Sequence, residues 1–272
     1  MNRPVFPTDA HQQIADETAA FFIAQPEVDT VLVVNSCARG VATADSDVDM
    51  AVLMSQTVTP LLIAQLESKW NLWRRDQKIF TNFQHSGRFC GLHLDIIDGR
   101  YAPEIWDDGG GPDGFELEIG NHIAYSALLT SAGPHFMQLQ KNWLPYYKNS
   151  LRQSRYKMAY EACLYDLEHV PFYAERGLLF QAFDRLYKAH QEFLQALFIG
   201  KKVYPLAYNK WIEWQLAHLL KLHNLTEQLA RTITVQKFDA EHLTTAAERL
   251  KTLLKETDEL LCNADVTLGL VT

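Results

Sequence analysis

Two aspartates separated by one residue follow a turn of small residues between two apolar runs. The first run is "VDTVLVV" (residues 28–34), the turn is "NSCARG" (35–40), and the second run is "DVDMAVLM" (47–54). Carboxylates in an apolar run are costly to bury unless a positive group binds them. Asp47 and Asp49 would lie on one face of a strand, where their charges repel unless a cation lies between them. Hard oxygen ligands of this type suit Mg²⁺.

A third carboxylate is expected on a later strand. Asp95 lies in "GLHLDIID" (91–98), among apolar neighbours, so it too would need a cation nearby. Asp98 is the alternative, although its place before a glycine fits a turn that ends the strand. The turn before the paired aspartates offers the hydroxyl of Ser36 and free backbone N–H groups. Such a turn suits phosphate oxygens.

Other polar residues near these motifs have two interpretations each. His93 would share a strand face with the third carboxylate, and a hydrogen-bonded structural role is favoured over a catalytic one. Arg39, inside the turn, either contacts phosphate or is an exposed loop arginine. Glu104, Asp107 and Asp108 precede a run of glycines and are expected to be solvated. A general-base role for one of these three acids is left open.

The stretch "NSCARGVATADSDVDMAVLM" (35–54) resembles the nucleotidyltransferase signature of the polymerase-β-like superfamily. That signature has Gly-Ser, a short spacer with glycine, and Ser-Asp-x-Asp on the next strand. The most similar sub-group is that of the minimal and the antibiotic nucleotidyltransferases. The residues that the resemblance places at the site are Ser36 for the phosphates of the nucleotide and Asp47, Asp49 and Asp95 for Mg²⁺, with Asp95 as metal ligand or base. Arg39 and Gly40, inside the same motif, are further candidates for binding the nucleotide.

One position departs from the family pattern. The first glycine of the signature is Asn35 here. This position closes a strand and is expected to need a positive φ, which asparagine tolerates better than most residues. Alternatively, Asn35 in place of glycine weakens the site. The fold would then survive as a nucleotide-binding or partner-binding module without catalysis.

The second half of the chain carries a softer resemblance. "LQALFIGKKVYPLAYNKWIEWQL" (194–216) is similar to the helical C-terminal domain of these enzymes, which closes over the nucleotide. The resemblance implies that Lys210 contacts phosphate and that Tyr204, Tyr208 and Trp211 line the cleft. The alternatives are an ordinary surface lysine and aromatic residues of a core.

The periodicity of apolar residues and the turn signals predict the elements that position these residues. The sequence predicts a helix over 9–25 capped by Asp9, a helix over 60–75, a loop or lid over 99–120, and a helical pattern over 121–144 broken near Gly133. Strands are expected at 28–34, 47–54, 78–84 and 91–98, and further helices at about 150–170, 175–199, 208–223 and 239–262. The fold class is therefore α+β, with a mixed-sheet nucleotidyltransferase domain over 1–143 and an all-α helical bundle over 144–272.

Composition excludes several classes. The 272-residue chain has a formal net charge of −8, which weighs against nucleic acid as a partner. No apolar stretch is long enough to cross a membrane, and the first residues lack the pattern of a signal peptide. Four cysteines without paired spacing indicate reduced thiols in a cytoplasmic protein. The cysteines are Cys37, Cys90, Cys163 and Cys262. The short basic groups, expected on solvated faces, are Arg152, Arg155 and Lys157, and Lys201 and Lys202.

The combined expectation is an enzyme that transfers a nucleoside monophosphate, AMP from Mg·ATP, to a hydroxyl of an acceptor and releases pyrophosphate. The acidic charge favours a small and cationic acceptor. The alternatives are a non-catalytic nucleotide-binding module and a toxin–antitoxin-type module that modifies a protein partner.

Overall fold

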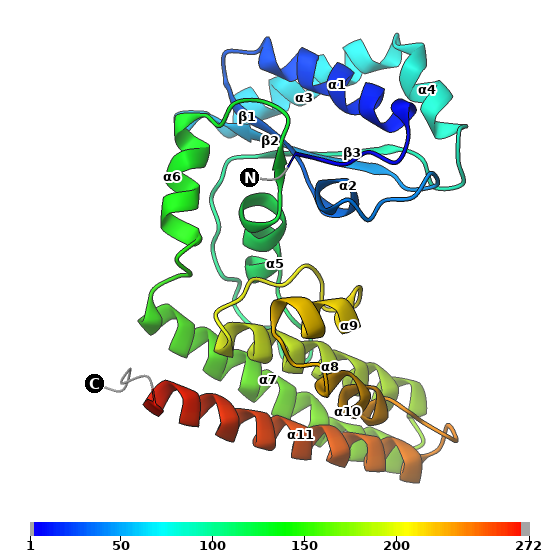
Figure 1. Ribbon diagram of the computed structural model, residues 1–272. Coiled ribbons are helices and arrows are strands. Elements are labelled where there is room, and N and C mark those ends of the chain that lie inside the picture. The colour runs from blue at the N-terminus through cyan, green and yellow to red at the C-terminus, as the bar shows by residue number, and fades with distance from the viewer. Residues whose placement is uncertain (1–2, 268–272) are drawn as a thin grey trace. The chain divides into compact units, whose positions relative to one another are not determined.

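The computed structural model describes residues 3–267, and side chains as far as residue 261. The chain forms two compact units (Figure 1). Residues up to 102, with 118–145, form the first unit, and residues 103–117, with those from 146 onward, form the second. The expected boundary near residue 143 lies beside one of these divisions. Residues 103–117, called here the inserted segment, belong to the second unit although the sequence placed them in the first domain.

A small mixed sheet forms the centre of the first unit, so the α+β class is confirmed. Its strands are β1 (Val28–Val33), β2 (Val48–Met54), β3 (Leu92–Ile97) and β4 (Ala127–Leu128), in the order β3-β2-β1-β4. Strand β1 pairs antiparallel with β2 and β4, whereas β2 and β3 are parallel. The parallel pair needs a crossover, which two helices supply.

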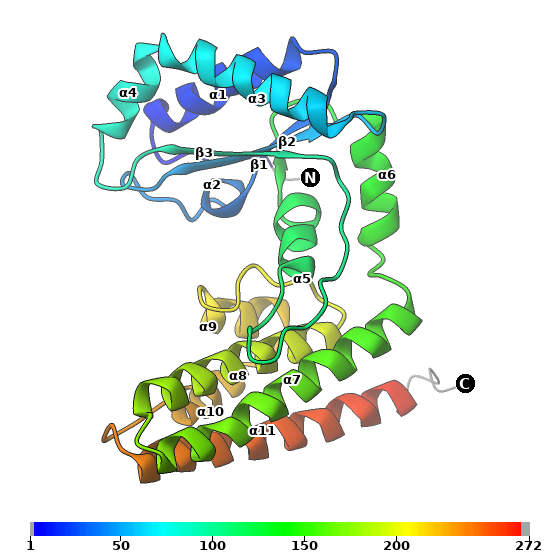
Figure 2. The ribbon, with the colours of Figure 1, turned by 180° about the vertical axis from the view of Figure 1, so that it is seen from behind.

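Helices cover the sheet of the first unit. They are α1 (Asp9–Ile23), α2 (Asn35–Arg39), α3 (Pro60–Arg75), α4 (Lys78–Gln84), α6 (Pro134–Trp143) and the π-helical turn η1 (Gly120–Ala124), while α5 (Phe115–Ile119) spans the division between units. Helices α1, α3 and α4 lie on one side of the sheet and α2 on the other (Figure 2). On the first side, Met50 and Val52 of β2 pack with Phe22 and Trp70. The alternate apolar side chains Val48, Met50, Val52 and Met54 of β2 therefore face these helices.

Two local predictions in this unit are wrong. Thr8, not Asp9, caps α1, because the Thr8 side chain accepts a hydrogen bond from the His11 backbone N–H. Residues 78–84, expected as a strand, form helix α4. Its aromatic residues Phe80 and Phe83 are three apart, so that both reach the core from one helix face.

The second unit is a bundle of helices. They are α7 (Asn149–Glu175), α8 (Leu179–Gly200), α9 (Ile212–Trp214), the π-helical turn η2 (Gln215–Leu219), α10 (Leu225–Thr232) and α11 (Ala240–Thr267). Helices α7, α8 and α11 lie side by side around the largest core cluster (Figures 1 and 2). Helix α10 was not expected, and the pattern over 121–144 yields only η1, β4 and α6.

Within the described range, no helix combines the length and apolarity needed to cross a membrane. Cys37, Cys90 and Cys163 are buried free thiols. The side chain of Cys262 lies outside the described residues.

Candidate functional site

Three acidic residues and a histidine share one face of strands β2 and β3. The pairing of the strands places Asp49 opposite His93 and Ala51 opposite Asp95. Side chains alternate along a strand, so Asp47, just before β2, points to the same side as Asp49. The apolar Val48, Met50 and Val52 occupy the opposite, helix-covered face. We call Asp47, Asp49, His93 and Asp95 the acidic face.

The electrostatics of this face centre on Asp49. Partial burial raises the pKa of Asp49, and the negative charge of Asp47 raises it further. Hydrogen bonding to Asn35 and the proximity of His93 oppose these effects, while Asp95 adds to them. The surroundings of Asp49 therefore disfavour its ionised form, and a cation bound nearby would stabilise that form.

His93 is a basic group in contact with the paired aspartates. Its Nε2 lies 3.4 Å from Oδ2 of Asp47, and its side chain is 70% exposed. The favoured interpretation of a structural histidine does not match this exposure. Only the protonated imidazole would form an ion pair here.

The turn between β1 and β2 is the short helix α2. Asn35 begins it with a φ of 54°, which confirms the positive φ expected at this position. The Asn35 side chain also hydrogen-bonds to Asp49 and lowers the pKa of that carboxyl. A glycine would supply the conformation without the hydrogen bond. Gly40 closes the helix with a φ of 70°.

Cys37 and Arg39 of α2 are both influenced electrostatically by Asp49. Burial, followed by the charge of Asp49, raises the pKa of the Cys37 thiol to about 11, so Cys37 is a neutral core residue. Burial lowers the pKa of Arg39, whereas Asp49 and Tyr125 oppose this shift. Ser36, half-buried, lies between Asn35 and Cys37 in the same helix.

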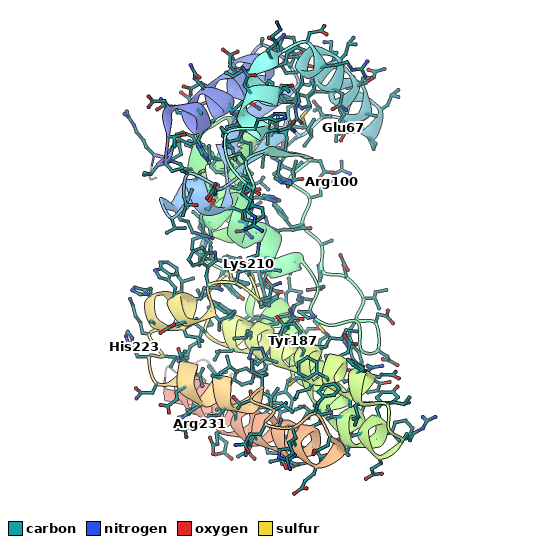
Figure 3. The ribbon with its side chains drawn as sticks, turned by 90° about the vertical axis from the view of Figure 1, so that its right-hand side faces the viewer. Glu67, Arg100, Tyr187, Lys210, His223 and Arg231 are labelled. Carbon is teal, nitrogen blue, oxygen red and sulfur yellow. The ribbon has the colours of Figure 1, made fainter. Side chains whose placement is uncertain are left out.

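The two candidates for the third carboxylate differ in position. Asp95 is on β3 and acts electrostatically on Asp49. Asp98 lies beyond the end of β3, where its Oδ1 accepts a hydrogen bond of 2.9 Å from the backbone N–H of Arg100 (Arg100 is labelled in Figure 3). Asp98 is thus a turn residue.

Sequence patterns gave no sign of His122, which lies near Asp95, or of its neighbour Tyr101. Burial lowers the pKa of His122, in η1, and the charge of Asp95 opposes this shift. The His122 ring lies 6.1 Å from the ring of Tyr101. Within the described residues, His122 Nδ1 and the Tyr101 hydroxyl are buried and without a hydrogen-bond partner. His122 is distant in sequence from both Tyr101 and Asp95, so only the fold brings it near them.

A metal ion is not held by protein side chains alone in this arrangement. Among the residues that the structure describes, no group of three or more histidine, cysteine, aspartate or glutamate side chains is placed to bind one. The donor set still fits Mg²⁺, which binds through one or two carboxylates and completes its shell with water and substrate phosphates. Asp47 and Asp49 offer that number of carboxylates, and Asp95 is the next one.

The remaining predicted site residues belong to the second unit. Lys210 is exposed (Figure 3). Tyr204 and Tyr208 are buried, and Tyr208 is part of the bundle core, whereas Trp211 is 48% exposed. The core interpretation therefore holds for the two tyrosines.

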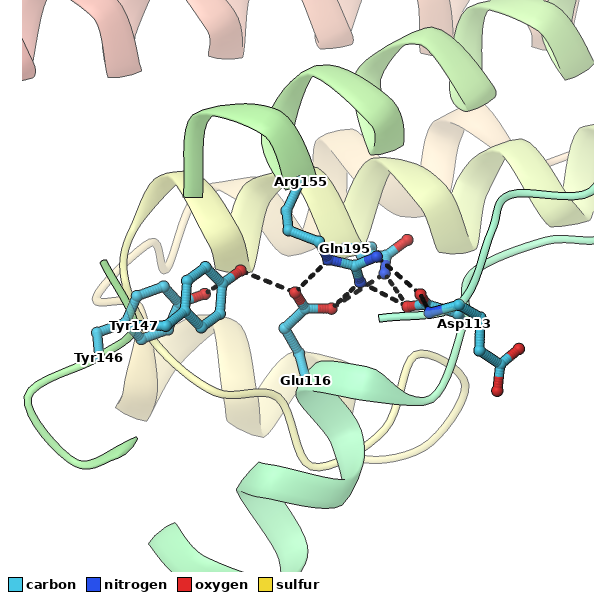
Figure 4. Close-up of polar contacts among 7 residues, drawn as sticks. Asp113, Glu116, Tyr146, Tyr147, Arg155 and Gln195 are labelled. Atoms are coloured by element: carbon cyan, nitrogen blue, oxygen red, sulfur yellow. Dashed lines mark hydrogen bonds and ion pairs between the residues drawn. The ribbon is translucent and has the colours of Figure 1, made fainter. Parts of the chain in front are cut away.

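A buried ionic network ties the inserted segment to the bundle (Figure 4). Arg155 donates to Asp113 at 2.5 and 2.7 Å and to Glu116 at 2.5 and 2.9 Å. Gln195 donates to both carboxylates, and Tyr147 donates to Glu116 at 2.7 Å. Burial lowers the pKa of Arg155, but its bonds to the two carboxylates outweigh this and raise it.

This network corrects the expectation for the basic group in α7. Arg152 and Arg155 are buried, at 6% and 4% exposure, instead of lying on a solvated face. Lys157 alone is exposed, where it lies 3.7 Å from Glu161. The carboxylate partners of Arg155 lie about 40 residues earlier in the chain, which is why the basic cluster looked like a surface feature.

A second group of buried polar residues lies along α7 and α8. Arg185 donates to Asp166 at 2.5 Å, and Glu192 is fully buried. Burial, followed by the charge of Asp166, raises the pKa of Glu192 to about 9. Burial also lowers the pKa of His190 to about 4. Glu192 is therefore protonated at neutral pH.

Comparison with models of known protein families gives no match, and comparison with curated protein sequences gives none either.

Proposed function

We propose that the protein is a metal-dependent nucleotidyltransferase that transfers AMP from ATP to a hydroxyl of a small acceptor and releases pyrophosphate. The observation that carries the proposal is the acidic face, where Asp47, Asp49 and Asp95 share one side of two neighbouring strands. The raised pKa of Asp49 supports a place for positive charge there. The nucleotidyltransferase architecture is part of the same proposal.

The residues of the chain have distinct roles in this reaction. Asp47 and Asp49 would hold Mg²⁺, which neutralises the triphosphate and lowers the pKa of the acceptor hydroxyl. Ser36, with Arg39 and Gly40 of the same short helix, binds the phosphates of the nucleotide. Asn35 holds Asp49 in place through its side-chain hydrogen bond.

The transfer itself is an in-line displacement. The acceptor oxygen bonds to the α-phosphorus, the bond from that phosphorus to the bridging oxygen breaks, and pyrophosphate leaves. Asp95 takes the proton of the acceptor hydroxyl. Positioning and charge neutralisation supply most of the catalysis in phosphoryl chemistry.

Pyrophosphate release is the direct test. Purified protein is incubated with labelled ATP, Mg²⁺ and a panel of small hydroxylated amines, sugars and nucleosides, beside an Asp47→Ala/Asp49→Ala variant. The matched control is Asp16→Ala/Glu17→Ala, which removes two exposed carboxylates of α1. Release that the first variant loses and the control keeps would support the proposal.

Two outcomes would overturn it. ATP binding without turnover for any acceptor would assign a nucleotide-binding module instead. AMP found by mass spectrometry on a co-purified protein, with no transfer to the panel, would replace the small acceptor with a protein partner.

A further inference from the structure

The second unit contains a cavity that no step of the proposed reaction uses. Its volume is about 390 Å³, near the lower end of the range of roughly 300–1,000 Å³ for small-molecule sites. The last turns of α8, the segment between η2 and α10, and α11 form its walls. All of these elements belong to one compact unit.

The floor of this cavity is aliphatic. Five leucines line it, and no phenylalanine, tyrosine or tryptophan does. The leucines are Leu197, Leu222, Leu225, Leu260 and Leu261. The uncharged polar side chains of the lining are Asn224, Gln228 and Thr257. A nucleobase is commonly bound by stacking on a large aromatic side chain, which this lining lacks. An unbranched alkyl chain matches it instead, because burial of methylene groups is the interaction that such a floor supplies.

The rim of the cavity is basic. Lys201, Lys221 and His223 line it, and no aspartate or glutamate does, in a chain whose formal net charge is −8. Among the described residues, neither lysine forms an ion pair. Two acidic residues next to lining residues have other partners, since Glu227 pairs with Arg231 and Asp258 accepts a hydrogen bond from Tyr156. His223 and Arg231 mark this end of the unit in Figure 3.

The backbone at Lys221 adds a separate indication. Lys221 has a φ of 59°, a left-handed conformation that glycine adopts without steric cost. It follows η2, where the Leu222 N–H bonds to the Leu216 carbonyl and so ends the helical turn. A lysine at this position places a charged side chain at the cavity mouth, which a glycine would not do.

We propose that this cavity binds a single-chain carboxylate amphiphile, with its alkyl chain among the leucines and its carboxylate between Lys201 and Lys221. Charge complementarity selects the head group, and the aliphatic floor selects the chain. The proposal is independent of the acidic face and of nucleotide transfer.

Octanoate is the probe, titrated by calorimetry into the full chain without nucleotide at about pH 7. Saturable binding is expected, with affinity rising roughly fourfold for each methylene from pentanoate to octanoate. Octylammonium, with the same chain and the opposite charge, should bind at least about tenfold more weakly. Lys201→Glu/Lys221→Glu should weaken octanoate binding by about tenfold or more. The control is Lys202→Glu, an exposed neighbour outside the lining, which should leave the affinity within about twofold.

Several results would overturn the proposal. The proposed carboxylate site is wrong if octanoate and octylammonium bind with equal affinity. It is also wrong if Lys202→Glu weakens octanoate binding as much as the double variant does. The chain pocket is wrong if affinity does not change with chain length, or if octanoate does not bind.

Discussion

Arg155 holds Glu116 through two hydrogen bonds, from Nε to Oε1 at 2.9 Å and from Nη2 to Oε2 at 2.5 Å, in a place where Glu116 has no exposed surface. The same guanidinium binds Asp113. A single cation therefore neutralises part of the charge of two carboxylates of the inserted segment. The stability of the segment depends on this contact, because buried carboxylates without a partner are strongly disfavoured.

Arg155→Ala should destabilise the second unit by about 3–5 kcal/mol, because it leaves Glu116 and Asp113 buried without their cation. The free energy of unfolding from urea titration, followed by circular dichroism, measures the loss. Lys157→Ala is the matched control in the same helix and should change the free energy by less than about 0.5 kcal/mol. Equal effects of the two substitutions would show that the network does not hold the segment.

Asp95→Asn should reduce pyrophosphate release by about a hundredfold or more, since a positioned acid–base group contributes on the order of 10² to 10⁴. Asp98→Asn should keep the rate within about threefold, because the asparagine oxygen can still accept the hydrogen bond from the Arg100 N–H. Steady-state rates at saturating ATP compare the two. A larger loss from Asp98→Asn would exchange their roles.

Glu192→Gln should make the protein less sensitive to alkaline pH. The pKa of Glu192 is raised to about 9 by burial and by Asp166, with Arg185 and Lys188 opposing the shift. Between its unfolded pKa and pH 9, the folded state therefore binds one proton more than the unfolded state. The wild-type free energy of unfolding then falls as the pH rises, by at most about 1.4 kcal/mol per pH unit.

The glutamine variant lacks this titration, so its advantage over wild type should be near zero at about pH 4, grow with pH, and level off above about pH 9. Urea titrations at a series of pH values measure the difference. Glu259→Gln, at an exposed glutamate of α11, is the control and should give a flat difference. A flat difference for Glu192→Gln as well would show that this carboxyl is ionised in the folded state.

Gly109→Ala should destabilise the second unit by about 1–3 kcal/mol more than Gly177→Ala. Both glycines have a positive φ, of 78° and 73°, so both substitutions strain the backbone. A Cβ at Gly109 would overlap the Arg185 guanidinium, whereas a Cβ at Gly177 meets nothing within 4 Å. Thermal unfolding of both variants separates the clash from the strain, and equal melting temperatures would contradict a close fit of Arg185 over the inserted segment.

Local signals were sufficient where the sequence prediction succeeded. Helix α3 begins and ends where expected because Thr59 caps it, Pro60 is its first residue, and Leu66 and Trp70 repeat at helical spacing. The strands β1, β2 and β3 were identified by their apolar runs. The positive φ of Asn35 was predicted from its place at a strand end, and it is observed.

Failures arose where partners distant in the chain decide the outcome. The residues of α4 have high strand propensity, yet Phe80 and Phe83 pack into the core as one helix face. Strand propensity reflects burial and packing more than backbone preference, so it misleads when a short aromatic segment packs as a helix. Likewise, Arg155 resembled a surface residue because its carboxylates lie in a glycine-rich segment that had been assigned to a loop.

The residues of the candidate site also fall into two groups, those that local sequence signals predicted and those that they did not. The alternation of side chains along β2 predicted that Asp47 and Asp49 share a face, and the parallel register with β3 adds Asp95. His122 and Tyr101 carry no local signature, because a lone histidine and a lone tyrosine are ordinary in any sequence. The π-helical turn brings His122 near Asp95, and the path after β3 places the Tyr101 ring 6.1 Å from the His122 ring.

The inserted segment has a consequence for how the protein can be dissected. The backbone passes from one unit to the other near residues 102, 117 and 145, so each unit is assembled from two stretches of chain. A fragment that begins at residue 146 would carry Arg155 without the two acids it binds. Because each unit is discontinuous in sequence, a single crossover point cannot exchange either unit between two proteins. A chimaera that exchanges the bundle must also exchange the fifteen-residue stretch from 103 to 117.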